Sequence, residues 1–123
     1  MKESILISGA SSGIGRALAF EFSKRGYALG LCARRVHLLE SLRNELPSET
    51  PVAIARVDLS RSDDIHKVFI NLAKELGNVK IVIANAGVSE KSFPGDGTFY
   101  LGKKVIDINL LGAMATIDVG TEI

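Results

Sequence analysis

The residues best suited to chemistry form a cluster of glycines and serines near the start of the chain, Ser8 to Gly15, with the sequence SGASSGIG. The cluster follows a short apolar run and precedes a stretch with helical periodicity. Glycines let the main chain approach a ligand closely, and the N–H groups at a helix start can bind a diphosphate. The spacing is not that of a P-loop, because no Gly-Lys-Ser/Thr follows. The cluster therefore predicts a dinucleotide-binding turn.

Three further polar motifs follow the glycine cluster in chain order. Val57-Asp58-Leu59 and Asn85-Ala86-Gly87 each come directly after an apolar run, and Asn109-Leu110-Leu111-Gly112 lies in a later helical stretch. The three motifs follow the glycine cluster in order and at suitable intervals, and the roles that they take depend on the resemblance described below.

Two arginines, Arg34 and Arg35, end the apolar run that follows the first helical stretch. An acidic residue at this place would bind the ribose hydroxyls of NAD(H), whereas a guanidinium binds the additional phosphate of NADP(H). We expect Arg34 to make this contact, with Ser12 as a further polar group and Arg35 pointing away. The alternative is a solvated pair of arginines on a turn. Because the arginine pair comes after the glycine cluster, we expect NADP(H) to be favoured over NAD(H).

The elements that must position these residues alternate along the chain. Strands are predicted at 4–8, 27–33, 51–57 and 79–84, and their near-continuous apolar character suits strands covered on both faces. Helices are predicted at about 13–24, around 39–46, and at 65–76, where Ser60 or Ser62 is the expected N-cap and Gly77 the stop. A loop is expected at 89–98, followed by a helix from Phe99 to about Met114.

A strand, a helix and a second strand repeated in this way predict an α/β fold. Right-handed crossovers would give a doubly wound, Rossmann-like parallel sheet of about four strands in the order 3-2-1-4, as one domain over residues 1–123. On the first helix, Ile14, Leu18 and Phe22 lie four residues apart.

Composition narrows the function classes. The formal net charge of +1 offers no broad basic face for nucleic acid or a membrane surface, and no targeting or membrane-spanning segment is recognisable, so we expect a cytoplasmic protein. The single cysteine, Cys32, is expected to be a buried structural thiol, and no Cys/His spacing suggests a metal site. His37 and His66 are expected at the solvated surface.

The four motifs together resemble those of the short-chain dehydrogenase/reductase family, whose T-G-x-x-x-G-x-G motif carries threonine where this chain has Ser8. The resemblance covers essentially the whole chain and implies that Asp58 contacts adenine, that Asn85 to Gly87 shape the cofactor floor, and that Asn109 is the catalytic-tetrad asparagine. The predicted cofactor contacts are Ser8, Gly9, Ser11, Ser12, Gly13, Ile14, Gly15, Arg34, Asp58, Leu59, Asn85, Ala86 and Gly87.

The resemblance also implies a serine and a Tyr-x-x-x-Lys segment beyond the asparagine, and neither is recognisable there. The string does occur at Tyr100 to Lys104, but it precedes Asn109, so we interpret it as coincidental. The implied function is the NADP(H)-binding portion of an oxidoreductase that transfers hydride between nicotinamide and a carbonyl or alcohol. The alternative is a truncated module without catalysis. An uncovered fourth strand or last helix would need a partner, so we expect a homo-oligomer.

Overall fold

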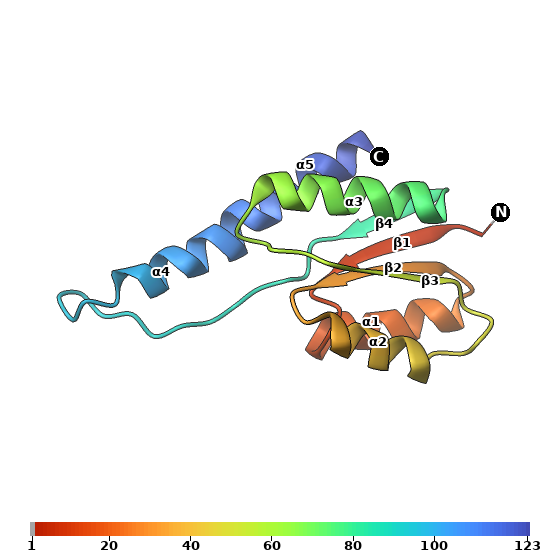
Figure 1. Ribbon diagram of the computed structural model, residues 1–123, viewed down its shortest axis with the longest axis horizontal. Coiled ribbons are helices and arrows are strands. Elements are labelled where there is room, and N and C mark those ends of the chain that lie inside the picture. Colours follow the sequence, from red (N-terminus) through yellow and green to blue (C-terminus); the bar gives the residue numbers. More distant parts are fainter. Residues whose placement is uncertain (1) are drawn as a thin grey trace.

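A computed structural model describes residues 2–123, and in it four parallel strands lie between two layers of helices (Figure 1). The strands are β1 (Ser4–Ser8), β2 (Ala28–Ala33), β3 (Val52–Arg56) and β4 (Val79–Ile83). Their order in the sheet is β3-β2-β1-β4, with every neighbouring pair parallel. The predicted Rossmann-like sheet and its strand order are confirmed, and the predicted strand ends differ by one residue at most.

The helices divide between the two faces of the sheet as its alternating side chains require. Helices α1 (Gly13–Lys24) and α2 (Val36–Glu45) cover one face, where they pack on Ile5, Ile7 and Leu31. Helices α3 (Ser62–Leu76) and α5 (Ala113–Glu122) cover the other face, where Leu6 and Cys32 point. Each face therefore has its own apolar core.

Burial is complete only for the two central strands. All residues of β1 and β2 are buried, which fits their continuous apolar runs. The outer strands β3 and β4 are partly exposed, and Ile81 of β4 is 38% exposed. The expectation that all four strands are covered on both faces is therefore wrong for β3 and β4, because each lies at an edge of the sheet.

On α1 the buried residues are the small ones, Gly15, Ala19 and Ser23, while Leu18 and Phe22 are partly buried against the core and Ile14 is 72% exposed. One prediction about α3 is wrong. At the start of α3 no serine caps the helix. The Ser60 hydroxyl bonds to Asp58 instead, and acidic residues occupy the first turn, where they suit the positive end of the helix dipole. The predicted stop at Gly77 is confirmed.

The last helical stretch is longer than the sequence predicts. Helix α4 (Phe99–Ile106) continues through a π-helical segment, η1 (Asp107–Gly112), into α5, so the helix passes Met114 and ends at Glu122. Gly112 packs against Leu59: a Cβ at Gly112 would stand 2.6 Å from the Leu59 carbonyl oxygen. A side chain at 112 would push the helix away from Leu59, so the close packing of these two segments requires glycine. Together with the preceding loop, α4 forms an arm that extends from the sheet (Figure 1).

The buried thiol of Cys32 should make stability fall at alkaline pH. Cys32 has no exposed surface in β2, and burial raises its pKa from 9.0 to about 12. Above pH 9 the unfolded chain loses this proton while the folded chain keeps it, so the folded state loses about 1.4 kcal/mol per pH unit until the folded pKa is reached. Urea titrations between pH 8 and about 12 measure this slope.

A Cys32→Ala variant isolates the contribution of the thiol. The variant is expected to be less stable at neutral pH, because it loses buried volume, but its stability should fall less steeply with pH above 9. Equal slopes for the two proteins would contradict the assignment, since other groups that titrate in this range are common to both.

Candidate functional site

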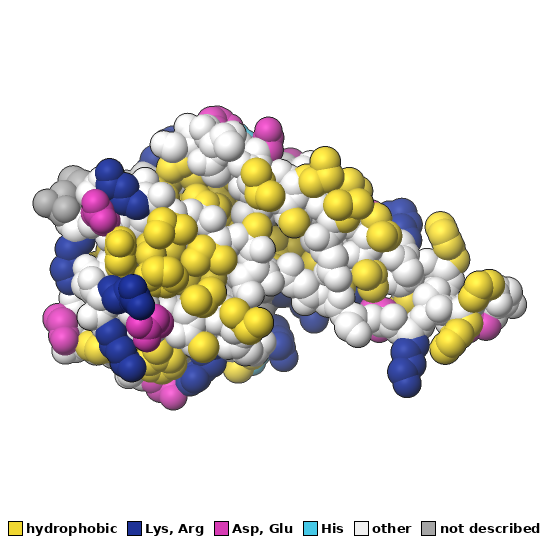
Figure 2. All heavy atoms as spheres, turned by 180° about the vertical axis from the view of Figure 1, so that it is seen from behind, with side chains coloured by type: hydrophobic (Ala, Val, Ile, Leu, Met, Phe, Trp, Pro, Cys, Tyr) yellow, Lys and Arg dark blue, Asp and Glu magenta, His cyan; other side chains and the backbone are white. Residues whose placement is uncertain are grey.

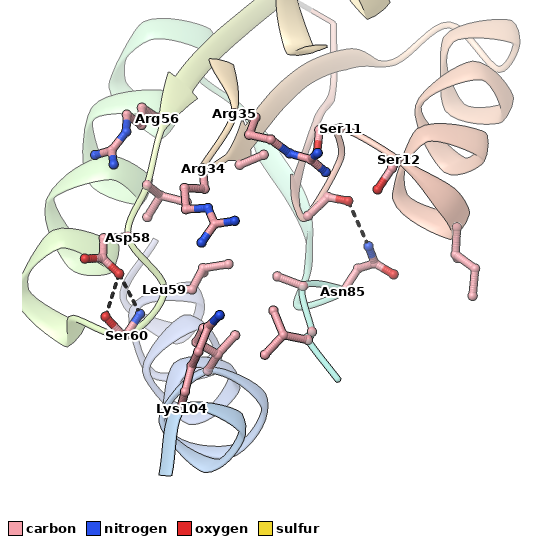
Figure 3. Close-up of a pocket in the computed structure, with 18 residues that line it drawn as sticks. Ser11, Ser12, Arg34, Arg35, Arg56, Asp58, Leu59, Ser60, Asn85 and Lys104 are labelled. Atoms are coloured by element: carbon pink, nitrogen blue, oxygen red, sulfur yellow. Dashed lines mark hydrogen bonds between the residues drawn. The ribbon is translucent and has the colours of Figure 1, made fainter. Parts of the chain in front are cut away.

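A cavity of about 640 Å³ opens at the carboxyl ends of the four strands (Figure 3). Its walls come from the turns that follow all four strands, exemplified by Gly9, Arg34, Asp58 and Asn85. Ligands of open parallel α/β sheets bind at this edge, where strand order reverses. The fold therefore brings together at one place residues that are far apart in the chain, such as Gly9 and Asn85.

Most of the predicted contact residues line this cavity. They are Gly9, Ser11, Ser12, Ile14, Arg34, Asp58, Leu59, Asn85, Ala86 and Gly87. The other predicted contacts do not line the cavity: Ser8 ends β1, and Gly13 and Gly15 lie in the first turn of α1. Asn109 also lies outside its wall, while its neighbour Ile108 is part of it.

Hydrogen bonds of Ser8 and Asn85 connect the ends of β1 and β4. The Ser8 hydroxyl oxygen accepts hydrogen bonds from the backbone N–H groups of Asn85 (3.1 Å) and Ala86 (3.2 Å). In return, the Asn85 amide donates to the carbonyl oxygens of Ser8 and Gly9, both at 3.2 Å. Gly9 has a φ of +65°, and a Cβ there would stand 2.7 Å from the Cα of Ala86. Only glycine fits this turn.

The start of α1 faces the cavity without a side chain that satisfies its backbone. Ser12 is the N-cap residue, but its hydroxyl makes no capping hydrogen bond, and no acidic residue occupies the first turn. Helix N-termini carry unpaired N–H groups and a partial positive charge that attract anions. With Ser11 and Ser12 on the cavity wall, this helix start can bind a phosphate group.

Asp58 forms a polar corner at the end of β3. Its carboxylate accepts hydrogen bonds from the Ser60 hydroxyl (2.6 Å) and the Ser60 N–H (3.0 Å). These two bonds, with the nearby charges of Arg56 and Arg61, hold the pKa of Asp58 below its usual value. The Asp58 N–H donates to the carboxylate of Asp64 at 2.7 Å. The corner therefore presents an ionised acceptor to the cavity.

Basic side chains outnumber acidic ones around the cavity. Arg34, Arg35, Arg56 and Lys104 all contribute to its wall, and Asp58 is the only acidic residue that does so within residues 2–123. Arg35 was expected to point away, but its side chain runs along the wall toward Ser11 (Figure 3).

Sequence reasoning missed Arg56 and Lys104. Arg56 ends β3 and lies two residues before Asp58. This position at a strand end is the one feature of the sequence that could have indicated Arg56. Lys104 is far away in the chain, on α4.

Asn109 uses its side-chain amide to hold the turn after β4. Its Nδ2 donates to the carbonyl oxygen of Val88, and its Oδ1 accepts from the Val88 N–H, both at 2.7 Å. The Gly87 Cα lies close by, since a Cβ there would stand 3.4 Å from the Asn109 Oδ1. The segment η1 thus fixes the floor of the cavity through this one side chain.

Other functional groups are sparse in the described part of the chain. Within residues 2–123, no three His, Cys, Asp or Glu side chains come close enough to hold a metal ion. No helix of this part has the length and apolar character needed to cross a membrane. His66 is about half exposed and pairs with Glu122 at 2.8 Å, which agrees with its expected place at the surface.

Comparison with known families and curated proteins gives a consistent result. The sequence model of the short chain dehydrogenase family matches residues 3–122. An uncharacterized oxidoreductase of Mycobacterium tuberculosis is 38% identical over 120 residues, which are 95% of this chain and 47% of that protein. Human dehydrogenase/reductase SDR family member 7 is 34% identical over 116 residues, 90% of this chain and 34% of that protein. The chain thus spans less than half of these relatives.

Solved structures give the same picture. An alcohol dehydrogenase from the archaeon Thermococcus sibiricus, complexed with 5-hydroxy-NADP, superposes with a TM-score of 0.87 at 30% identity. The match covers 96% of this chain and 52% of that one. A short-chain dehydrogenase from Sphingobium yanoikuyae in complex with NADPH has a TM-score of 0.82 at 30% identity, with 97% and 46% covered.

Proposed function

The chain belongs to the short-chain dehydrogenase family, and we propose that it forms the NADP(H)-binding part of an oxidoreductase acting on a carbonyl or alcohol. The observation that carries this proposal is the cavity with Arg34, Arg35, Arg56 and Lys104 around it and only one carboxylate, Asp58. A ligand with a diphosphate and a further phosphate suits such a wall.

The glycine turn supports the diphosphate part of the proposal. At Gly13, the first residue of α1, a Cβ would meet nothing within 4 Å, so the backbone there is open. The uncapped start of α1 leaves backbone N–H groups that can bind a diphosphate. Two solved relatives, described as complexes with 5-hydroxy-NADP and NADPH, add support from proteins of the same fold.

Within this proposal the residues have separate tasks. Arg34 binds the additional phosphate of NADP(H), Asp58 with Leu59 contacts the adenine, and Asn85 to Gly87 form the floor. Asn109 keeps that floor in place through Val88 and is the proposed tetrad asparagine. When bound, the cofactor would supply or accept the hydride at its nicotinamide.

Tyr100 and Lys104 are not the proton-transfer pair in this proposal. Tyr100 stands on the first turn of α4, is 66% exposed and does not line the cavity. A catalytic pair spaced i, i+4 must present both side chains to the same substrate. In this proposal no residue of the 123 takes the part of the family's serine, tyrosine or lysine.

The alternative is a module that binds nucleotide, or associates with itself, without catalysis. Purified chain of 123 residues is titrated with NADPH and NADH by fluorescence, and carbonyl-dependent oxidation of NADPH is then measured. The proposal predicts binding, tighter for NADPH, with no turnover at this length. Turnover would refute the interpretation of Tyr100 and Lys104, and tighter binding of NADH would remove the role of Arg34. Binding of neither would refute the proposed function.

Self-association is a further part of the proposal, as is the cytoplasmic location predicted from the sequence. Hydrophobic side chains gather on the rear face of the body and along the arm to its tip (Figure 2). Exposed apolar residues include Ile81 on β4, and Met114 (57%) and Ile117 (60%) on α5. Exposed apolar patches and free sheet edges favour burial against a second copy. Sedimentation equilibrium should give a mass above that of one chain, and a monomeric mass would contradict this part.

A further inference from the structure

One residue of the Tyr100 to Lys104 string lies in the candidate site, although the string takes no part in the proposed proton transfer. Lys104 lines the cavity, and Tyr100 does not. Lys104 lies on α4, one turn before Ile108, which also lines the cavity. The helix therefore presents a cation and an apolar side chain, one above the other, to the same space.

Lys104 lies across the cavity from the arginine assigned to the phosphate. Figure 3 shows the Lys104 ammonium and the Arg34 guanidinium pointing toward one another from α4 and from the end of β2. The one carboxylate of the wall, on Asp58, is engaged by Ser60. Two cations that face each other repel, and an anion between them turns this repulsion into attraction.

Glu90 holds Lys104 from outside the cavity. Its Oε1 lies 2.9 Å from the Lys104 Nζ, and the two side chains are 31% and 38% exposed. Glu90 does not line the cavity. The ion pair connects the loop after β4 to α4. The other cations of the wall, Arg34, Arg35 and Arg56, take part in no ion pair within residues 2–123.

We propose that Lys104 is a second specificity residue for NADP(H), which acts with Arg34 from the opposite wall to hold the 2′-phosphate. The inference rests on the proposed function. It assigns to Lys104 a role in binding, distinct from the catalytic lysine that its spacing from Tyr100 suggests.

The test compares two ligands that differ by this phosphate, adenosine 2′,5′-bisphosphate and 5′-AMP, by isothermal titration calorimetry. For Lys104→Gln we expect about fivefold weaker binding of the bisphosphate, the scale of a partly exposed charge pair, and a change of less than about twofold for 5′-AMP. Lys104→Arg keeps the charge and should restore most of the affinity. Far-UV circular dichroism checks the fold of each variant.

Lys103→Gln is the matched control. It removes the same charge from the adjacent position, where Lys103 pairs with Asp107 and does not line the cavity, so bisphosphate affinity should stay within about twofold. In 1 M KCl the difference between Lys104→Gln and the unaltered chain should nearly disappear, because the screening length falls to about 3 Å.

The outcomes separate this inference from the proposed function. Equal losses of bisphosphate and 5′-AMP affinity in Lys104→Gln would overturn the phosphate role and place Lys104 against the base. No loss in Lys104→Gln, or the same loss in Lys103→Gln, would overturn the inference and leave the proposed function standing. Failure of the unaltered chain to bind either ligand or NADPH would refute the proposed function itself.

Discussion

Replacement of Gly15 by alanine is expected to destabilise the fold by about 3 kcal/mol, although alanine is the better helix former. A Cβ at this position would overlap the carbonyl oxygen of Gly9 and stand 2.6 Å from the Asn85 Nδ2. The Asn85 amide would have to move, with loss of its hydrogen bonds to Ser8 and Gly9, each worth about 1 kcal/mol. Urea denaturation should show the loss, and NADPH binding should weaken because the same turn forms the cavity.

Gly102→Ala provides the matched control for this substitution. Gly102 is also a helical glycine, but a Cβ there would stand 3.4 Å from the Ser92 Oγ, at the edge of ordinary contact. On helix propensity alone the change should stabilise α4 by up to about 1 kcal/mol. If Gly15→Ala were as stable as Gly102→Ala, the close packing of α1 against the two turns would be wrong.

The contrast between these glycines shows what the sequence can and cannot predict. The short apolar runs and the motifs between them were sufficient to predict the sheet and its strand order. They also predicted the turns that carry Gly9, Asp58 and Asn85. On α1, periodicity points to the large apolar residues Ile14, Leu18 and Phe22. The buried positions of this helix are instead occupied by the small residues Gly15, Ala19 and Ser23. Close backbone packing through small residues cannot be recognised from hydrophobic periodicity.

The remaining errors concern contacts between distant parts of the chain. The π-helical segment and the continuation of the last helix coincide with the contact of Gly112 with Leu59, 53 positions earlier. Likewise, no local pattern indicates that Lys104 on α4 returns to the cavity that Arg34 lines. Residues that directly follow strands are predictable members of such a site, since parallel strands end together. Residues that a later helix brings back depend on where that helix packs, and require the structure.

Charge reversal at the end of β2, Arg34→Asp, is expected to weaken NADPH binding about 100-fold. Charge-assisted hydrogen bonds are worth about 1.5–3 kcal/mol each, and the introduced carboxylate also repels the phosphate. For NADH the expected affinity is unchanged or higher, because Asp can accept hydrogen bonds from the ribose hydroxyls. Arg34 is exposed and forms no ion pair among residues 2–123, so its replacement should leave stability within about 0.5 kcal/mol.

Arg43→Asp makes the same change of charge on α2 without touching the cavity. Arg43 lies in the last turn of α2 and is not part of the cavity wall, so its reversal reports the effect of net charge alone. NADPH affinity should fall by less than about threefold in this variant, and the fall should vanish in high salt. Arg34→Asp should keep most of its NADPH defect there, because direct hydrogen bonds are lost along with the charge. An equal loss of NADPH and NADH affinity in Arg34→Asp would contradict selection through the 2′-phosphate.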